Sequence, residues 1–197
     1  MMTHATDRHE TTDRHERGPD FITADEHKQL LIGAGRLRHP ERNRLLIMLL
    51  YRHGLRESEA VGLYLRDIDL ARARLWVRRL KNGLSTEHPL AGDELRLLRR
   101  YLRVRDSSLP WLFINGQQGQ LSRHSVIYVI QQAAEQGGIA RRITPHMLRH
   151  GCGYYLANRG HDLRVIQDYL GHRDPRHTAR YTRTAAHRFQ NLWADTA

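Results

Sequence analysis

Residues 144–150 have the sequence TPHMLRH, and the rest of the chain is arranged around this stretch. Thr144 followed by Pro145 predicts a helix start, because a hydroxyl is a favoured N-cap and proline at the first helical position loses no hydrogen bond. Such a helix places His146 and Arg149 on one face, since residues three apart are neighbours on a helix surface. An imidazole beside a planar guanidinium near a helix N-terminus suits the binding of an anion, above all a phosphate.

Two further groups follow within a short distance. Gly171-His172 ends an apolar segment, and Tyr181 lies ten residues beyond the glycine. Cutting a phosphodiester without a metal needs a nucleophile that can hold the phosphate, cations for the non-bridging oxygens and an acid for the leaving oxygen. A tyrosine with a pKa near ~10 is protonated at neutral pH, so a neighbouring base or a cationic field must help it. We expect Arg56 and Lys81 to be brought to the same site by the fold.

The charge of the chain favours a polyanionic partner. With 32 basic residues against 21 acidic ones, the formal net charge is +11 and the pI is near 10.6, which points to nucleic acid. Lys28 and Lys81 are the two lysines, so 30 of the basic residues are arginines. Genomic base composition accounts for such a bias, and it makes each remaining lysine more informative.

Other classes of protein are disfavoured. Cys152 is the single cysteine, so no intrachain disulfide can form and a reducing compartment is expected. The fourteen histidines are scattered, and His150-x-Cys152 lacks partners at ligand spacing; we therefore expect no metal and no cofactor. The longest apolar run, 45–51, is too short to cross a bilayer and the N-terminus shows no signal peptide. These features predict a cytoplasmic protein, associated with the nucleoid.

The hydrophobic pattern predicts a mostly helical α+β domain over residues 21–197, behind a disordered basic tail over 1–20. The tail carries TDRHE twice, at 6–10 and 12–16, and has nothing to bury. Capping and apolar periodicity predict helices over 23–37, 40–53, 93–102, 122–136 and 163–170, a short one that carries Ala60, Val61 and Leu63, one that opens at Pro145, and a short amphipathic one around Phe189, Leu192 and Trp193. A change of period predicts a three-stranded antiparallel sheet from 65–70, 75–77 and 85–90, with Lys81-Asn82-Gly83 as a turn whose glycine is available for positive φ.

Five pieces of the sequence, in this order, resemble the signature of the tyrosine recombinases. They are GLRESE at 54–59, the lysine of the turn at 81, HxxR at 146–149, LGH at 170–172 and Tyr181. The resemblance extends over roughly residues 21 to 190, and it implies the catalytic domain of that family. It makes Tyr181 the nucleophile and Lys81 the acid for the departing 5′-oxygen. The clamp on the scissile phosphate would be Arg56, Arg149 and His172, with His146 as a helper in proton movement and Glu59 supporting Arg56.

Two assignments have competitors within the sequence. His150 lies on the same predicted helix face as His146; the HxxR spacing favours His146, and we expect His150 to pack or to support the site. Tyr154, Tyr155 and Tyr169 compete with Tyr181, but they fall at helical core spacings and are expected to be packing residues.

Most tyrosine recombinases carry a separate DNA-clamping domain, whereas only the short tail precedes Phe21 here. In this the chain resembles the short invertases that flip fimbrial promoter segments. The resemblance implies a 3′-phosphotyrosyl intermediate without ATP, double-stranded DNA with inverted-repeat sites, a homotetramer that exchanges C-terminal segments, and DNA-bending accessory proteins. The alternatives are an integrase or resolvase of a mobile element, a type IB topoisomerase-like activity, and a DNA-binding regulator that has lost catalysis.

Overall fold

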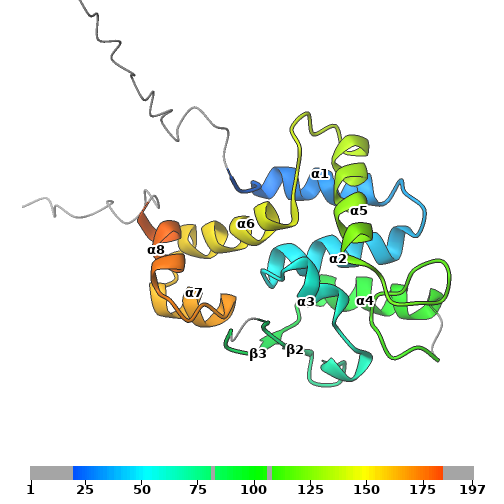
Figure 1. Cartoon of the computed structure of the whole chain (residues 1–197), viewed down its shortest axis with the longest axis horizontal. Coiled ribbons are helices and arrows are strands. Elements are labelled where there is room, and N and C mark those ends of the chain that lie inside the picture. Colours follow the sequence, from blue (N-terminus) through cyan, green and yellow to red (C-terminus); the bar gives the residue numbers. More distant parts are fainter. Residues whose placement is uncertain (1–19, 81–82, 106–107, 184–197) are drawn as a thin grey trace, which may run out of the picture.

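Helices make up most of the fold, as the sequence predicts. The computed structural model describes residues 20–80, 83–105 and 108–183 (Figure 1). Most of the predicted tail, Lys81 and Asn82 of the turn, and the predicted helix around Phe189 lie outside these residues. The elements in chain order are α1 (Ala24–Ala34), α2 (Pro40–Arg52), α3 (Glu57–Val61), the 3₁₀ helix η1 (Leu65–Asp67), β1 (Ile68–Asp69), β2 (Arg74–Val77), β3 (Thr86–Pro89), α4 (Gly92–Val104), α5 (Arg123–Gln136), α6 (Pro145–Asn158), α7 (Leu163–Leu170) and α8 (Arg176–Arg183).

Local capping signals set most helix starts. Thr23 and Glu26 form the predicted capping box of α1, with the Glu26 N–H donating to the Thr23 hydroxyl at 3.1 Å. At α6 the Thr144 hydroxyl accepts from the Met147 N–H at 3.4 Å, and Pro145 occupies the first turn. Helix α1 ends three residues before the predicted Leu37, because its last turn reaches the weak helix former Gly35, which caps it.

The sheet has the strand order β1-β2-β3 and is antiparallel throughout. Leu75 pairs with Ile68 on one side and with His88 on the other. The predicted third strand over 65–70 is correct only at its end, since its first residues form η1. The prediction for Gly83 was wrong: among the described residues, the glycines with positive φ are Gly54, Gly138, Gly160 and Gly171.

Two hydrophobic clusters hold the described fold together. The larger one is centred on α2, where residues 45–50 are all buried, and it includes side chains of α1, α4, α5 and the sheet. The smaller one joins α6, α7 and α8 through Cys152, Ile166, Leu170 and Tyr181. Fully burying a leucine or isoleucine contributes about 1.5–3 kcal/mol. Helix α8 contributes Tyr181 to the smaller cluster, and burial of that side chain holds α8 against α6 and α7.

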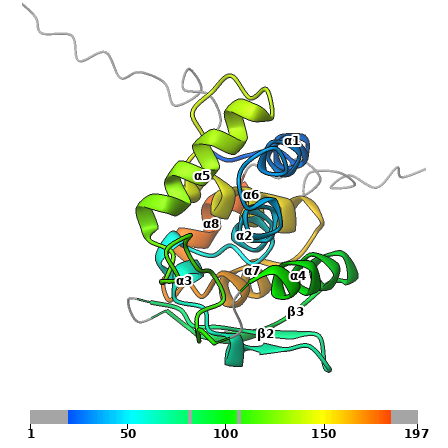
Figure 2. The same ribbon diagram turned by 90° about the vertical axis from the view of Figure 1, so that its right-hand side faces the viewer.

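The elements are arranged in two groups that meet along α6. The sheet lies at the opposite end of the molecule from α1 and α5, with α4 near the sheet (Figure 2). Helices α7 and α8 lie at one side, against the C-terminal half of α6 (Figure 1). Within the described ranges, no helix is both long enough and apolar enough to span a bilayer.

Candidate active site

Arg56 is placed by the turn that ends α2. Gly54 has φ of +55°, a left-handed conformation that glycine adopts without strain. A Cβ at this position would collide with the Leu170 side chain. Arg56 is then the N-cap of α3, and its guanidinium donates to Glu59 Oε1 at 2.6 Å while its backbone N–H donates to Oε2 at 3.0 Å. Its side chain stays 27% exposed, so the cation is held in place yet remains accessible.

Arg149 connects this turn to the end of α7. Its guanidinium is buried and donates to the carbonyl oxygens of Gly54 and of Leu170, the latter at 2.8 Å. Carbonyl groups in the last turn of a helix lack partners within the helix, so Arg149 also caps α7. Burial, together with the charges of Arg79 and Arg56, lowers the pKa of Arg149 to about 10. The group therefore stays cationic at neutral pH.

Glu59 is the carboxylate around which the arginines gather. It is buried and lies 2.6 Å from Arg56, 2.9 Å from Arg79 and 4.0 Å from Arg149. Burial acts to raise the pKa of Glu59, but the charges of Arg79, Arg149 and Arg56 and the backbone hydrogen bond from Arg56 outweigh it and hold the pKa below its usual range. A charged Glu59 thus partly balances three clustered cations.

Arg79 is a site residue that the sequence did not reveal. Its side chain is fully buried and donates to Glu59 Oε2 at 2.9 Å and to the carbonyl oxygens of His53 at 2.9 Å, Gly54 at 3.2 Å and Tyr169 at 2.6 Å. Burial lowers its pKa. A signal was present, because the alternation along β2 turns Leu75 and Val77 inward and predicts the same for position 79.

His172 follows Gly171, whose φ of +69° ends α7. The imidazole is buried, and its Nδ1 lies 2.8 Å from the Thr178 hydroxyl. The amide of Gln167 donates to the His172 carbonyl oxygen at 3.0 Å. Burial and the charges of Arg149 and Arg56 lower the pKa of His172 to about 3, so the ring is neutral at physiological pH.

Tyr181 lies in α8 and is 1% exposed. Its ring is roughly parallel to that of His172 at 6.4 Å between centroids, and its hydroxyl lies 2.9 Å from Nδ1 of His150. Burial raises the pKa of Tyr181 to about 12, although the charges of Arg149 and Arg180 oppose the shift. The competing tyrosines behave mainly as packing residues: Tyr154 contacts Tyr181 edge-on and Tyr169 packs on His88, whereas Tyr155 is 48% exposed.

The two other predicted catalytic residues are His146, which the structure describes, and Lys81, which it does not. His146 lies in the first turn of α6 and is exposed, unlike the buried Arg149 three residues later. Lys81 lies outside the described residues, but both ends of its turn are at the site. The Leu80 N–H donates to Glu59 Oε1 at 3.3 Å, and a Cβ on Gly83 would come within 3.0 Å of the Gly171 carbonyl oxygen.

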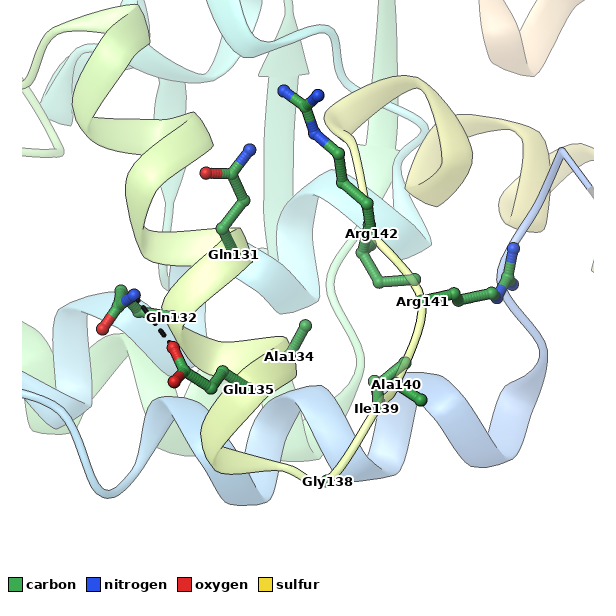
Figure 3. A pocket seen from close by; sticks show the side chains of 10 residues that line it. Gln131, Gln132, Ala134, Glu135, Gly138, Ile139, Ala140, Arg141 and Arg142 are labelled. Atoms are coloured by element: carbon green, nitrogen blue, oxygen red, sulfur yellow. Dashed lines mark hydrogen bonds between the residues drawn. The ribbon is translucent and has the colours of Figure 1, made fainter.

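A separate pocket of about 820 Å³ lies between the end of α5 and the segment that leads to α6 (Figure 3). Its wall includes Gln132, whose amide donates to Glu135 at 3.2 Å, and Arg142. None of the predicted site residues lines it. The candidate site is therefore the cluster of Arg56, Glu59, Arg79, Arg149, His172 and Tyr181.

Comparison with known proteins identifies relatives along most of the chain. The model of the phage integrase family matches residues 20–188. Type 1 fimbriae regulatory protein FimB of Escherichia coli strain K12 is 42% identical over 178 residues, covering 88% of this chain and 89% of that protein. FimE of the same strain is 46% identical over 157 residues, covering 77% and 79%. Tyrosine recombinase XerD of Mycobacterium tuberculosis strain H37Rv is 38% identical over 190 residues, covering 90% and 61%.

Solved structures share the fold. The XerA recombinase matches with a TM-score of 0.75 and 27% identity, over 83% of this chain and 60% of that one. The XerH site-specific recombinase bound to its palindromic difH substrate, in a post-cleavage complex, matches with a TM-score of 0.73 at 22% identity, over 89% of this chain and 53% of that one. The family match contains every residue of the candidate site, and the fimbrial relatives align over most of their own length. The chain therefore belongs to the phage integrase family and is a tyrosine recombinase.

Proposed function

We propose that this protein is a site-specific DNA recombinase that cuts and rejoins DNA through a 3′-phosphotyrosyl intermediate at Tyr181. The observation that carries the proposal is the convergence of two guanidinium groups, an imidazole and a phenol from four distant segments. Arg56 after α2, Arg149 on α6 and His172 after α7 meet beside Tyr181 on α8. Such a set can hold a phosphodiester and attack it without a metal.

The phosphate clamp, made of Arg56, Arg149 and His172, would bind the non-bridging oxygens. Arg56 offers the accessible guanidinium, and Glu59 fixes its orientation by accepting one hydrogen bond from the guanidinium and one from the Arg56 backbone N–H. As attack proceeds, negative charge grows on these oxygens, and the two fixed guanidinium groups stabilise it more in the transition state than in the ground state. The clamp therefore lowers the barrier rather than only binding DNA.

The leaving 5′-oxygen needs a proton, which we assign to Lys81. The assignment is supported by the flanking residues, since the Leu80 N–H donates to Glu59 and Gly83 lies close to the Gly171 carbonyl oxygen. His146, exposed one turn before His150, is assigned to proton movement on the DNA side. The phosphotyrosyl bond conserves the energy of the broken linkage, so rejoining requires no ATP.

The substrate is proposed to be double-stranded DNA with inverted-repeat sites, where four copies would assemble and exchange their C-terminal segments, with DNA-bending proteins as accessories. The net charge of +11 supports a DNA partner, and a DNA partner places the protein at the nucleoid. FimB and FimE, at 42% and 46% identity, support inversion of a promoter-bearing segment as in phase variation.

A second candidate is an integrase or resolvase of a mobile element. Its support is that XerD, 38% identical over 190 residues, is named a tyrosine recombinase without reference to fimbriae. Inversion and excision use the same chemistry and differ in the relative orientation of the two sites. The DNA next to the gene separates them, because inverted repeats around a promoter predict inversion and direct repeats predict excision.

The test is expression of the protein with a plasmid that carries the flanking repeats, followed by mapping of the segment that changes orientation. Tyr181→Phe removes one oxygen, so it should abolish both inversion and covalent adducts on a nicked suicide substrate while DNA binding changes by only a few fold. Adducts that persist in Tyr181→Phe would mean that another tyrosine attacks. Inversion without any adduct in the unmodified protein would contradict the phosphotyrosyl mechanism.

A further inference from the structure

The hydroxyl of Tyr181 has a single side-chain partner among the described residues. The ring lies against Gly153, where a Cβ would approach it to 2.6 Å, and Tyr154 contacts it edge-on at 5.1 Å between centroids. Its hydroxyl meets His150 Nδ1 at 2.9 Å. Residues 150, 153 and 154 are all on α6, so the Tyr181 side chain packs against one face of this helix. Only 1% of Tyr181 is exposed, so little bulk water reaches its hydroxyl to serve as a base.

The protonation states of Tyr181 and His150 determine which of the two donates in this hydrogen bond. Burial raises the pKa of Tyr181 to about 12, so the hydroxyl carries its proton. Burial and the charge of Arg180 lower the pKa of His150 to about 4, so the imidazole is neutral. When its one proton is on Nε2, Nδ1 has a lone pair and accepts from the hydroxyl. The charged and titratable groups that face the imidazole are Arg180 on α8, Asp20 before α1, and His146 and Arg149 on α6.

Other groups near Tyr181 are unsuited to take its proton. The thiol of Cys152 donates to the Arg52 carbonyl oxygen, and burial raises the pKa of Cys152 to about 12. His172 presents its ring face to Tyr181 and engages Nδ1 with the Thr178 hydroxyl. The remaining neighbours that carry charge are the cations Arg149 and Arg180. In the described part of the site, His150 is the neutral base in contact with the nucleophile.

We propose that His150 is the catalytic residue that takes the proton of Tyr181 during attack and returns it during rejoining. The inference rests on Tyr181 being the nucleophile. As the bond from Tyr181 Oη to phosphorus forms, the proton passes to His150 Nδ1. The bond from phosphorus to the 5′-oxygen breaks with its electron pair on that oxygen, which takes a proton from Lys81. In rejoining, a 5′-hydroxyl attacks phosphorus, and the imidazolium returns its proton to the departing Tyr181 oxygen.

Transfer from a phenol to this imidazole is unfavourable before DNA binds, but the reaction does not require it then. The proton of an attacking hydroxyl becomes acidic as its oxygen bonds to phosphorus, so transfer accompanies attack. The bound phosphodiester brings negative charge that stabilises an imidazolium nearby, and Arg149 stabilises charge on the phenol oxygen. His150 therefore takes the proton while Tyr181 attacks the phosphorus, and not before the attack begins.

The experiment measures single-turnover adduct formation on a nicked suicide duplex that carries the mapped inverted-repeat site, using the full chain. His150→Asn places an amide oxygen near the position of Nδ1, which keeps an acceptor for the hydroxyl but cannot take a proton. We expect its rate at pH 7 to fall ~10²–10³-fold, within the range of a lost general base. Because solution hydroxide must then remove the proton, the rate should rise about tenfold per pH unit from pH 6 to 9. The rate of the unmodified protein should be nearly flat over this range.

Two comparisons separate chemistry from packing. Tyr155→Phe removes one oxygen from a side chain of the same helix that is 48% exposed and packs on Tyr51, and it should cleave within a few fold of the unmodified protein with the same flat profile. A 5′-bridging phosphorothiolate, which needs no acid, should not rescue His150→Asn. His150→Ala, which leaves space at Nδ1, should regain adduct formation when imidazole is added.

A His150→Asn rate equal to or faster than that of the unmodified protein would overturn the inference, because His150 would then only hold Tyr181 in place. A slow variant with an unchanged pH profile and no imidazole rescue would overturn it as well. Both outcomes leave the proposed function intact if the unmodified protein forms adducts. Failure of the unmodified protein to form any adduct would instead remove the proposed function, and the inference with it.

Discussion

Replacing Arg79 by methionine should be among the most destabilising changes at the site. Methionine fills a similar volume but donates no hydrogen bond. The lost guanidinium is fully buried and serves the Glu59 carboxylate and the carbonyl oxygens of His53, Gly54 and Tyr169. These acceptors belong to the end of α2, to α3 and to the end of α7. One side chain of the β2–β3 hairpin therefore secures three other segments.

The size of the expected loss of stability depends on which of these acceptors still have another donor in the variant. Glu59 keeps Arg56, and the Gly54 carbonyl oxygen keeps Arg149, so the losses fall on the carbonyl oxygens of His53 and Tyr169. A buried acceptor that loses its donor costs about 1–3 kcal/mol. Two of them cost about 2–6 kcal/mol, while the variant no longer has to desolvate a buried cation. We expect the free energy of unfolding to fall by about 3–5 kcal/mol, as when one partner of a buried ion pair is removed.

The assay is urea unfolding of the full chain, with Arg78→Met as the matched control. Arg78 is the preceding residue and pairs with Asp67, but its own side chain is 43% exposed. The Asp67 carboxylate is buried but keeps the Tyr64 N–H as a donor at 2.9 Å, so we expect the loss of Arg78 to cost about 1 kcal/mol, the lower end of the range for a buried acceptor that loses a donor. Arg79→Lys should lie between the two, because its ammonium reaches fewer of the four acceptors. Losses for Arg79→Met and Arg78→Met within about 1 kcal/mol of each other would refute the reasoning, since charge and not the buried network would then decide stability.

Three further predictions concern catalysis and use adduct formation on the suicide substrate. Arg149→Lys keeps the charge but loses the planar fork that reaches two carbonyl groups, so cleavage should fall at least ~100-fold; a smaller loss would mean that charge alone suffices. Lys81→Ala should be slowed ~10²–10⁴-fold on ordinary DNA and restored on a 5′-bridging phosphorothiolate, whereas Arg56→Ala should stay slow on both; no rescue would place the acid elsewhere. Gly153→Ala puts a Cβ within 2.6 Å of the Tyr181 ring, and the displaced ring should slow cleavage ~10²-fold; a normal rate would contradict this packing.

Elements with local signals could be predicted from the sequence. The capping box at Thr23, the Thr144-Pro145 start and the Gly171 stop each depend on a few adjacent residues, and the structure confirms them. Helix α8 had no such signal, since its sequence RHTARYTR has almost no apolar residues. Its buried face consists of Thr178, Tyr181 and Thr182, and contact with α6 and α7 creates that burial. Tertiary packing therefore determined what local propensity did not indicate.

The site residues likewise divide into those that a motif indicated and those whose role depends on contacts distant in the sequence. The motif order indicated Arg56, Arg149, His172 and Tyr181 as one set, and the structure places them together. The environment of Arg79 depends on residues up to 90 positions away. No motif marked it among the thirty arginines of the chain. The contact of His150 with Tyr181 spans 31 positions, so spacing along α6 alone favoured His146.

The arrangement of the site across two hydrophobic clusters has a mechanical consequence. Arg56 and Glu59 are fixed to the larger cluster through the turn at Gly54, whereas Tyr181 is part of the smaller one with α7 and α8. Arg149 and Arg79 bridge the two, since each donates both to the Gly54 carbonyl oxygen and to a carbonyl group at the end of α7. A phosphate that draws the Arg149 guanidinium away from these carbonyl groups would loosen α7 and α8 from the larger cluster. Under the proposed function, binding of DNA at the clamp is coupled to the position of Tyr181, because Arg149 serves both.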